Sequence, residues 1–360
     1  MPRVYNFSAG PSMLPLSVLE KARDELLEYG TFGQSVMEMS HRSKEYLSII
    51  EGCEEKLRAL LGINEDYAVL FLQGGAWTQF AMLPMNLMTV RKTADFVLSG
   101  YWAKKAYTEA EKFGSANAVA SSEQDSFSYI PEIDESKLDP EADYLHICFN
   151  NTIYGTEFRG IPESAAPLAA DVSSMLLSRP LDTAKFGILY AGAQKNMGIA
   201  GLTVVIIRKS LIERSPEGLP SMFSYKVQHG AASMFNTPPA YAIYMMSLVL
   251  EWLESEIGGL ETMHEINREK ARILYDYLDE SRLFYPTARK DSRSLMNICF
   301  VTGDKSVDML FCSEAKKRGL LNLAGHRLVG GVRASLYNAM PIEGVTALRD
   351  FMSEFEKGHI

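Results

Sequence analysis

Cysteine is scarce in this 360-residue chain, and its four cysteines are scattered with no Cys-x-x-Cys pair. Cys53, Cys148, Cys299 and Cys312 therefore fit reduced thiols in a cytosolic protein better than a disulfide or zinc framework. His146 and Cys148 would share one face of a strand, but such a pair alone more often packs than binds a metal. We expect no metal site.

The sequence also lacks an apolar stretch long enough to cross a bilayer. The least polar helical stretch, residues 240–250, is about half of the ~20 residues that a span requires, and Glu251 closes it. Residues 1–15 contain no apolar core flanked by a small-residue cleavage site, so they do not resemble a secretory signal. These features predict a cytoplasmic protein that does not bind membranes.

Positive charge is in deficit, because 36 Lys and Arg residues face 45 Asp and Glu residues, giving a net charge of −9. This balance argues against nucleic-acid binding, which usually relies on a basic surface. No tract is rich enough in Gly, Ser or Pro to indicate disorder, and 47% of the residues are hydrophobic. The length favours two domains, each with its own core.

Hydrophobic periodicity predicts two amphipathic helices near the start, over residues 18–27 and 46–60, with Gly30 and Gly62 as their ends. Short apolar runs then alternate with helical stretches that begin near Thr78 and Ala103. The runs cover residues 67–72, 95–99, 144–149, 168–174, 186–191 and 202–208. This alternation predicts an α/β fold with a mostly parallel central sheet and helices on both of its faces.

The pattern changes after two further helices, expected over residues 241–253 and 264–279. Apolar runs at 295–302 and 332–337, a helix over 307–318 and a final helix indicate a smaller α+β unit. We expect a large domain over residues 16–260 and a small domain formed by residues 1–15 and 261–360. Gly258 and Gly259 lie in a helical region rather than in a flexible linker.

In open α/β sheets, ligands bind beyond the carboxyl ends of the strands, so the residues that follow each apolar run are informative. After residues 67–72, Gly74 and Gly75 allow a tight turn. The amides of Ala76 and Trp77 could then point at an anion such as a phosphate at a helix N-terminus. Alone, the two glycines indicate only a turn, and Trp77 could simply pack.

Two further strand ends carry aromatic or polar residues. Tyr101 and Trp102 lie where a strand gives way to a helix, so a flat ring could cover a planar ligand or merely seal the core. Asn150, Asn151 and Thr152 are turn formers that also offer amide and hydroxyl groups.

Two charged residues follow the next apolar runs. Asp171 ends an apolar strand, where burying an unpaired carboxylate would cost several kcal/mol, so it needs a partner. Lys195 lies between two apolar strands among small residues, where a partly desolvated amine could act as a nucleophile. A lysine in a turn is otherwise usually a solvated cap.

Together these residues form the set that pyridoxal-phosphate (PLP) chemistry requires: a lysine for the aldehyde, a carboxylate for the ring nitrogen, an aromatic ring stack and a phosphate cradle. Their order along the chain resembles that of fold-type I PLP enzymes. The chain resembles the phosphoserine aminotransferase family from about Tyr5 to the final helix. Nine strings carry this resemblance: NFSAGPSMLP, SHRSKEY, LQGGA, GYWAKKA, NNTIYGTEF, DVSSMLLSRP, YAGAQKN, MFNTPP and GHRLVGGVRASLYNAMP.

This resemblance implies a class-V, fold-type I enzyme with pyridoxal 5′-phosphate as its cofactor. It implies a homodimer in which the neighbouring subunit completes each active site. The implied reaction transfers the amino group of L-glutamate to 3-phosphohydroxypyruvate and yields O-phospho-L-serine and 2-oxoglutarate, as in serine biosynthesis. In some bacteria the family also aminates a four-carbon phosphorylated analogue, giving 4-phosphohydroxy-L-threonine for pyridoxine (vitamin B6) biosynthesis.

The resemblance assigns Lys195 to the Schiff base, Asp171 to the ring nitrogen and Trp102 to the ring stack as catalytic residues. The implied cofactor-binding residues are Gly75, Ala76, Trp77, Trp102, Thr152, Asp171, Gln194 and Lys195, with Asn236 and Thr237 reaching the phosphate from the other subunit. The implied substrate-binding residues are His41, Arg42, His326, Arg327 and Arg333, with Arg333 on the α-carboxylate.

The arginines suit this assignment, because both substrates are dianionic and a guanidinium binds a carboxylate or phosphate in bidentate fashion. Arg42 could instead be a surface residue at a helix start, and Arg327 and Arg333 could form salt bridges. However, the segment GHRLVGGVRAS contains no acid, which favours anion binding. Because the protein is acidic overall, it needs such a local cluster of positive charge to bind anionic substrates.

Four residues depart from the family pattern. Trp77 replaces a small residue, Met175 a more polar one, Ile199 a common proline and Ala324 a frequent lysine. The last change bears on phosphate affinity. Two other functions are disfavoured. A different fold-type I reaction would not need the cationic cluster, so His41, Arg42 and Arg327 argue against it. A silent PLP-binding protein would be expected to lack a catalytic group, and none is missing here.

Overall fold

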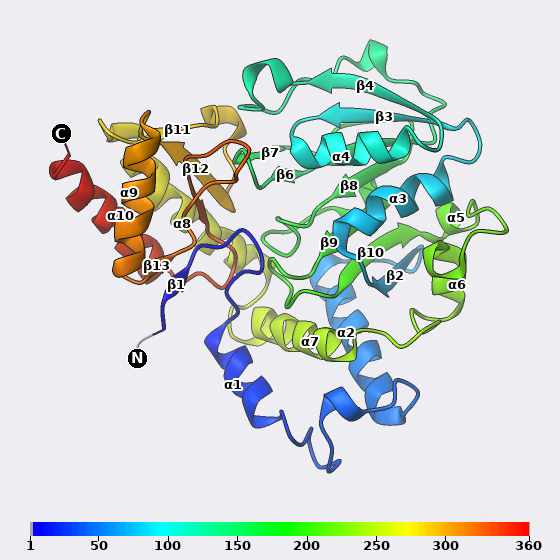
Figure 1. Cartoon of the computed structure of the whole chain (residues 1–360). Coiled ribbons are helices and arrows are strands. Elements are labelled where there is room, and N and C mark those ends of the chain that lie inside the picture. Colours follow the sequence, from blue (N-terminus) through cyan, green and yellow to red (C-terminus); the bar gives the residue numbers. More distant parts are fainter. Residues whose placement is uncertain (1–2, 360) are drawn as a thin grey trace.

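A seven-stranded sheet forms the centre of the protein (Figure 1), for which a computed structural model describes residues 3–359. The order across this sheet is β2-β10-β9-β8-β5-β3-β4. In chain order the strands are β2 (Tyr67–Leu72), β3 (Thr93–Leu98), β4 (Ser115–Ser121), β5 (Tyr144–Cys148), β8 (Leu168–Asp171), β9 (Ile188–Gly192) and β10 (Thr203–Arg208). The predicted α/β fold with a mostly parallel sheet is confirmed.

One strand of this sheet, β10, runs antiparallel to both of its neighbours, β9 and β2. The physical reason is the short connection from β9 to β10 over residues 193–202, which contains no crossover helix. Without such a crossover, consecutive neighbouring strands can pair only in antiparallel orientation. Lys195 therefore lies in a hairpin loop at the carboxyl end of β9.

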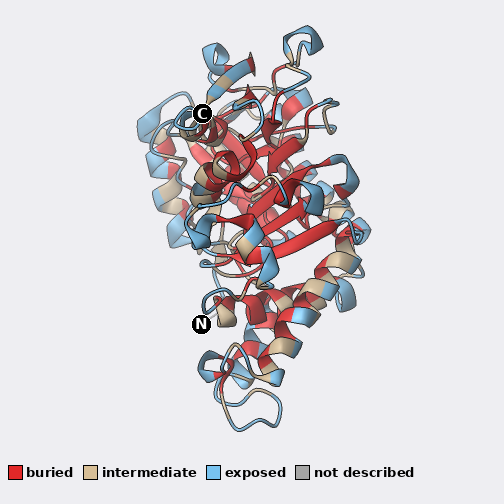
Figure 2. Cartoon of the chain, turned by 90° about the vertical axis from the view of Figure 1, so that its right-hand side faces the viewer, coloured by how far each residue is buried: buried red, intermediate tan, exposed pale blue. Residues whose placement is uncertain are grey.

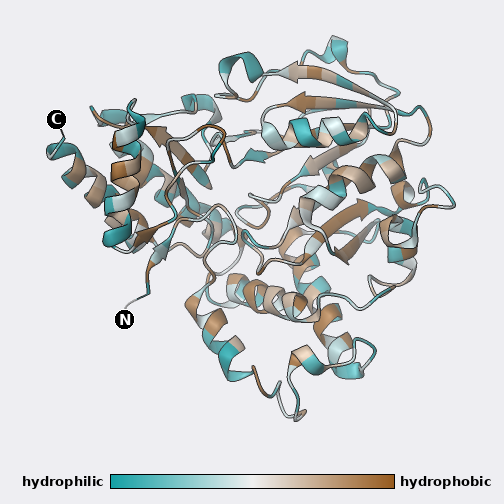
Figure 3. Ribbon diagram, viewed as in Figure 1, coloured by the Kyte–Doolittle hydropathy of each residue, from teal (hydrophilic) through white to brown (hydrophobic). Residues whose placement is uncertain are grey.

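Helices cover both faces of the sheet. Side chains of β2 alternate between two core clusters, with Val69 and Phe71 in one and Leu70 and Leu72 in the other. The first cluster includes residues of α2 (Lys44–Leu61) and α7 (Ala240–Ser255), and the second includes residues of α3 (Gly75–Leu87) and α4 (Tyr101–Ala110). Buried strands consequently run through the middle of Figure 2, and Figure 3 shows hydrophobic residues concentrated along β2, β10 and α7.

A further core cluster lies in the unit on the left of Figure 1. Its elements are β11 (Tyr285–Pro286), β12 (Asn297–Val301), β14 (Val332–Ser335), α8 (Leu260–Glu280), α9 (Lys305–Lys317) and α10 (Ile342–Lys357). The N-terminal strand β1 (Tyr5–Asn6) pairs in parallel with β13 (Leu320–Leu321), and Phe7 and Met13 belong to this cluster. Gly258 and Gly259, with φ of 88° and 101°, separate α7 from α8. We therefore keep the proposed domain boundary at residue 260.

The remaining elements are short. The helices are α1 (Leu16–Asp24), α5 (Lys209–Ile212) and α6 (Tyr225–Gly230), and the strands β6 (Asn150–Asn151) and β7 (Thr156–Glu157) form a hairpin. Single 3-10 turns cover Val36–Glu38, Glu123–Asp125, Glu135–Lys137, Thr183–Lys185, Ser221–Phe223 and Lys290–Ser292.

Two details of the sequence prediction were wrong. The first helix ends at Asp24 and not at Gly30, so Leu26 and Leu27 lie outside it and are exposed. The strand β4 was missed, because its sequence SANAVAS is small and polar and has neither a continuous apolar run nor a clear alternation. Such a sequence suits β4 because it is the edge strand of the sheet.

We expect Phe311→Ala to destabilise the second unit strongly. Phe311 on α9 is fully buried, and its ring centroid lies 5.1 Å from that of Phe284 and 5.2 Å from that of Phe355. Truncation should lower the free energy of unfolding by about 3–5 kcal/mol, measured by urea unfolding. Met309→Ala, on the same helix but 70% exposed, is the control and should change it by less than about 0.5 kcal/mol. Equal losses in the two variants would contradict the packing described for α9.

Candidate active site

A pocket of about 130 Å³ opens at the carboxyl ends of β5, β8 and β9. It brings together most of the residues predicted to hold the cofactor, although they are spread over more than a hundred positions of sequence. Its lining consists of Gly75, Ala76, Trp77, Trp102, Cys148, Asn150, Thr152, Asp171, Ser173, Ser174, Gly192, Gln194 and Lys195. The lining residues that were not among the predicted site residues are Cys148, Asn150, Ser173, Ser174 and Gly192.

Asp171 is a buried carboxylate at the last position of β8. One carboxylate oxygen accepts a hydrogen bond from the amide of Ser173 at 2.9 Å. Burial raises the pKa of Asp171, whereas the hydrogen bonds from Ser173 and the positive charge of Lys195 act in the opposite direction. Within residues 3–359, Asp171 forms no ion pair. A protonated ring nitrogen would supply the cationic hydrogen-bond donor that this carboxylate lacks.

Lys195 lies in the β9–β10 loop against the N-terminal segment. The Ser12 amide donates to the carbonyl of Gln194 at 3.0 Å, and the Ser12 hydroxyl donates to the carbonyl of Lys195. A Cβ atom on Gly10 would lie only 3.0 Å from Cε of Lys195, so the glycine allows this close approach. The lysine Nζ lies 5.8 Å from the ring centroid of Tyr337. The N-terminal segment and Tyr337 therefore enclose the lysine side chain.

A glycine turn after β2 forms a cradle for an anion. Gly74 has φ of +92°, and a Cβ there would overlap the Thr78 side chain, so the position requires glycine. The amide of Gly75 donates to Oγ1 of Thr203 at 2.8 Å. The amides of Ala76 and Trp77 lie in the first turn of α3, where no preceding helical turn supplies acceptors. These amides fit the cofactor phosphate.

The aromatic wall of the pocket is Trp102, the second residue of α4. Its ring centroid lies 5.9 Å from that of Trp77, with an interplanar angle of 86°, and 5.1 Å from that of Tyr101. These edge contacts hold Trp102 beside the pocket. Trp77 therefore combines a packing contact with an amide in the anion cradle, and its indole is 51% exposed.

A buried network of amides and hydroxyls ties this edge of the sheet to the second unit. Nδ2 of Asn150 donates to Ser174 Oγ and to Asn297 Oδ1, both at 2.8 Å. Asn297 on β12 in turn donates to Ser335 Oγ on β14 at 2.9 Å. The network places β14, which carries Arg333, next to the pocket wall. The sequence indicated Asn150 as a turn former that also offers an amide group, but not its partners in this network.

A positive cluster adjoins the pocket on the side of the second unit. Burial lowers the pKa of His326, and the positive charges of Arg333 and Arg327 lower it further. The His326 ring centroid lies 6.1 Å from that of Tyr101, so the cluster reaches α4. In the described part of the chain, neither arginine forms an ion pair, in contrast to the salt-bridge alternative.

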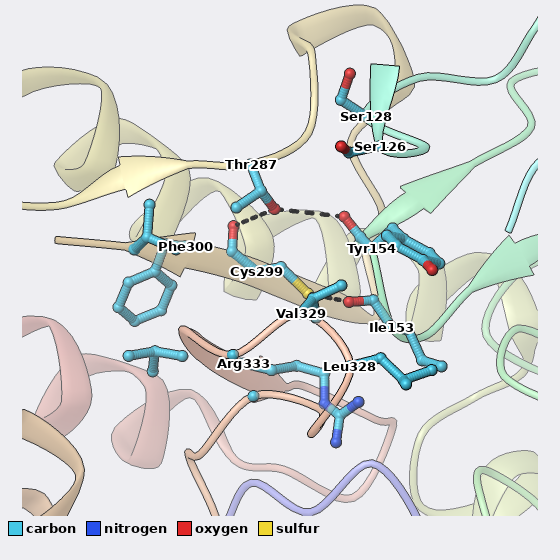
Figure 4. Close-up of a pocket in the computed structure, with 14 residues that line it drawn as sticks. Ser126, Ser128, Ile153, Tyr154, Thr287, Cys299, Phe300, Leu328, Val329 and Arg333 are labelled. Atoms are coloured by element: carbon cyan, nitrogen blue, oxygen red, sulfur yellow. Dashed lines mark hydrogen bonds between the residues drawn. The ribbon is translucent and has the colours of Figure 1, made fainter. Parts of the chain in front are cut away.

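Arg333 also borders a larger cavity of about 380 Å³ (Figure 4). This cavity lies between β12, residues 325–333 and residues 126–128 and 153–154. Its lining includes neither Lys195 nor Asp171. The Nε atom of Arg333 is buried and has no hydrogen-bond partner among residues 3–359.

Other predicted residues lie away from the Lys195 pocket. Asn236 lines a separate pocket beside Gln73, and the Thr237 carbonyl accepts a hydrogen bond from Gln73 at 3.3 Å. His41 and Arg42 lie between Val36–Glu38 and α2, and Arg42 is exposed. None of them lines the pocket within one chain. Their predicted roles require a second subunit and stay predictions.

Ser12, Thr203 and Tyr337 also shape the site; Ser12 and Tyr337 lie in two of the strings that resemble the family, but the sequence analysis gave none of the three residues a role. Each acts on a residue that is distant in sequence: Ser12 on the Lys195 loop, Thr203 on Gly75, and Tyr337 on the N-terminal segment. Across residues 3–359, no group of three or more His, Cys, Asp or Glu side chains could hold a metal ion. No helix in the same range is both long and apolar enough to span a membrane.

Comparisons with known proteins agree with this geometry. Residues 4–348 match the family model of class-V aminotransferases. The chain is 51% identical over 358 residues to the phosphoserine aminotransferase of Geobacillus kaustophilus, covering 99% of each chain.

Solved structures agree as well. The phosphoserine aminotransferase of Bacillus circulans subsp. alkalophilus superposes with a TM-score of 0.96 at 44% identity, covering 99% of each chain. A PLP-bound phosphoserine aminotransferase from Trichomonas vaginalis gives a TM-score of 0.93 at 38% identity, covering 98% of this chain and 100% of that one. The chain therefore belongs to the phosphoserine aminotransferase family of class-V, fold-type I enzymes and is a pyridoxal-phosphate-dependent aminotransferase.

Proposed function

We propose that the protein transfers the amino group of L-glutamate to 3-phosphohydroxypyruvate and so produces O-phospho-L-serine and 2-oxoglutarate. The observation that carries this proposal is the shared pocket of Lys195 and Asp171, which adjoins an unpaired cationic cluster. The names of the full-length relatives support the choice of substrates. A silent binding protein is disfavoured because every predicted catalytic group lines the pocket.

Each pocket residue has a distinct task in this function. Bound pyridoxal phosphate supplies an aldehyde that receives the amino group and a ring that delocalises negative charge from the substrate Cα. Lys195 would hold the aldehyde, and its free amine would carry the proton between the substrate Cα and the aldehyde-derived carbon of the cofactor. Asp171 would keep the ring nitrogen protonated. The aromatic side chain of Trp102 would cover the ring.

Polar groups fix the cofactor in place. The amides of Ala76 and Trp77 bind the phosphate, helped by the N-terminus of α3. Thr152 and Gln194 line the same pocket and supply side-chain hydrogen bonds to the cofactor.

The cationic residues bind the two ends of each substrate. Arg333 takes the α-carboxylate, and His326 with Arg327 takes the distal phosphate or carboxylate. A guanidinium without an acidic partner can offer both of its N–H edges to such an anion.

We propose that the active unit is a cytoplasmic homodimer. Trp77, Met222, Phe223 and Phe235 are exposed apolar residues, and Met222 and Phe223 line the same pocket as Asn236. Gly74 lines this pocket as well, so a second copy that covers the apolar residues would bring polar groups to the anion cradle. His41 and Arg42 would reach the substrate from the partner in the same way.

We expect Lys195→Ala to abolish transamination and the visible absorption band of the bound cofactor, because no other lysine lines the pocket. The assay couples L-glutamate with 3-phosphohydroxypyruvate and compares pyruvate and the four-carbon phosphorylated analogue as acceptors. Wild-type protein should prefer a phosphorylated acceptor. Retained turnover in the variant would refute the role of Lys195, and a preference for pyruvate would refute the proposed substrate.

Replacing a phosphate-binding arginine should weaken binding of the phosphorylated substrate. Arg42→Ala and Arg327→Ala should each raise KM for 3-phosphohydroxypyruvate, because each removes a charge-assisted hydrogen bond. The rise should correspond to a loss of about 1.5–3 kcal/mol in binding free energy. Steady-state kinetics measures the effect. Arg349→Ala, which lies on α10 and pairs with Asp350, should leave KM unchanged. An unchanged KM in Arg42→Ala or Arg327→Ala would exclude that arginine from the substrate site.

If Asn236 and Thr237 act across the dimer, dissociation should weaken cofactor binding. Dilution of the protein until sedimentation shows monomers should raise the dissociation constant for pyridoxal phosphate, followed by absorbance. The Asn236→Ala variant, studied as a dimer, should also show a raised dissociation constant for pyridoxal phosphate, but a smaller rise than the wild-type monomer shows. Undiminished binding by the monomer would argue against shared sites.

A further inference from the structure

Lys270 is a fully buried lysine that the proposed chemistry does not use. It lies on α8, and its Nζ donates to the carbonyl oxygens of Leu336 and Tyr337 at 3.0 Å and of Asn338 at 3.3 Å. An ammonium group has three N–H donors, so this arrangement uses all of them. Among the described residues, Lys270 forms no ion pair.

The backbone that Lys270 binds has few other donors. In the described part of the chain, no other group donates to the carbonyls of Leu336 and Asn338. An apolar residue in place of Lys270 would leave these buried carbonyls unpaired. Burial lowers the pKa of the Lys270 ammonium to about 7, and the carbonyls act against this effect because they bind the charged form.

The segment 336–338 directly follows β14, the strand that carries Arg333. Within it, the Tyr337 hydroxyl donates to the carbonyl of Ala9 at 2.8 Å, and its ring centroid lies 5.8 Å from Nζ of Lys195. Tyr337 thus holds the N-terminal segment against the lysine and forms one side of the space around its amine.

Asn338 acts on the neighbour of Lys195. Its amide donates to Oδ1 of Asn196 at 3.0 Å, and its Nδ2 donates to the carbonyl of Leu177 at 2.8 Å. Asn196 in turn donates to the carbonyl of Leu176 at 3.2 Å. These bonds connect segment 336–338 with the loop that holds Lys195 and with residues that follow β8.

We propose that Lys270 is a positioning residue, whose ammonium gathers the three carbonyls of residues 336–338 and so holds Tyr337 and Asn338 against Lys195 and Asn196. The inference rests on the proposed role of Lys195. Lys270 touches neither substrate nor cofactor, and acts only through the backbone that follows β14. A misplacement of Lys195 by about 1 Å would lower the rate of proton transfer far more than it would lower substrate binding.

The test compares Lys270→Met, which keeps most of the apolar side chain but removes the three donors, with Leu274→Ala. Leu274 is fully buried on the same helix and makes no hydrogen bond to segment 336–338, so its truncation destabilises the core without releasing the carbonyls. Both variants are studied as cofactor-loaded protein. Melting temperature, kcat, KM for L-glutamate and amide hydrogen exchange at Leu336 and Asn338 are measured.

In Lys270→Met we expect kcat to fall by at least about tenfold while KM changes by less than about threefold. Exchange at Leu336 and Asn338 should accelerate by at least about tenfold. Leu274→Ala should lower the melting temperature but leave kcat and the exchange at these amides near their wild-type values. An unchanged kcat in Lys270→Met, or an equal fall in Leu274→Ala, would overturn the proposal.

If Lys270→Met does not fold, Lys270→Gln replaces it under the same criteria, because the glutamine amide can bind at most two of the carbonyls. The exchange measurement needs no turnover. It therefore separates a failure of this inference from a failure of the proposed substrate assignment.

Discussion

The active site depends on a buried carboxylate that forms no ion pair among residues 3–359. Asp171 ends β8 between two buried neighbouring strands, and its amide hydrogen bond from Ser173 compensates only part of the cost of burial. A cationic partner would offset the rest of that cost, and we propose the ring nitrogen of the bound cofactor as that partner. The folded chain is therefore organised to receive the cofactor, because the anion cradle at Gly74 and the amine of Lys195 face the same pocket.

The reversed strand β10 explains how the lysine reaches this pocket. A parallel neighbour would have required a crossover helix after β9, which would have carried the chain away from the sheet edge. The hairpin instead keeps Lys195 at the carboxyl end of β9, and Thr203 at the start of β10 then accepts the hydrogen bond from the Gly75 amide. One irregularity of the sheet thus orients both the lysine and the phosphate cradle.

Positive charge is concentrated locally in this acidic protein, which suits the dianionic substrates that we propose for it. His326, Arg327 and Arg333 lie close enough that the two arginines lower the pKa of the histidine, and neither arginine forms an ion pair among the described residues. Like charges so arranged repel one another, so the cluster is a cost to folding that an anionic substrate relieves. The buried ammonium of Lys270 also lacks an acidic partner. Three backbone carbonyls bind it instead.

The sequence by itself determined the strands β2, β5, β8 and β9 and the candidates Asp171, Lys195 and Trp102, because buried strands are continuous apolar runs and polar residues at their ends stand out. It could not reveal β4, whose edge position tolerates a small polar sequence, or the end of α1 at Asp24. Only the tertiary structure decided that Ser12, Thr203 and Tyr337 meet the site, and that Arg42 lies outside the pocket within one chain. The physical reason is that these contacts join residues that are far apart in sequence. Hydrophobic periodicity predicts which side of a helix or strand is buried, but it does not predict which residues pack against that side.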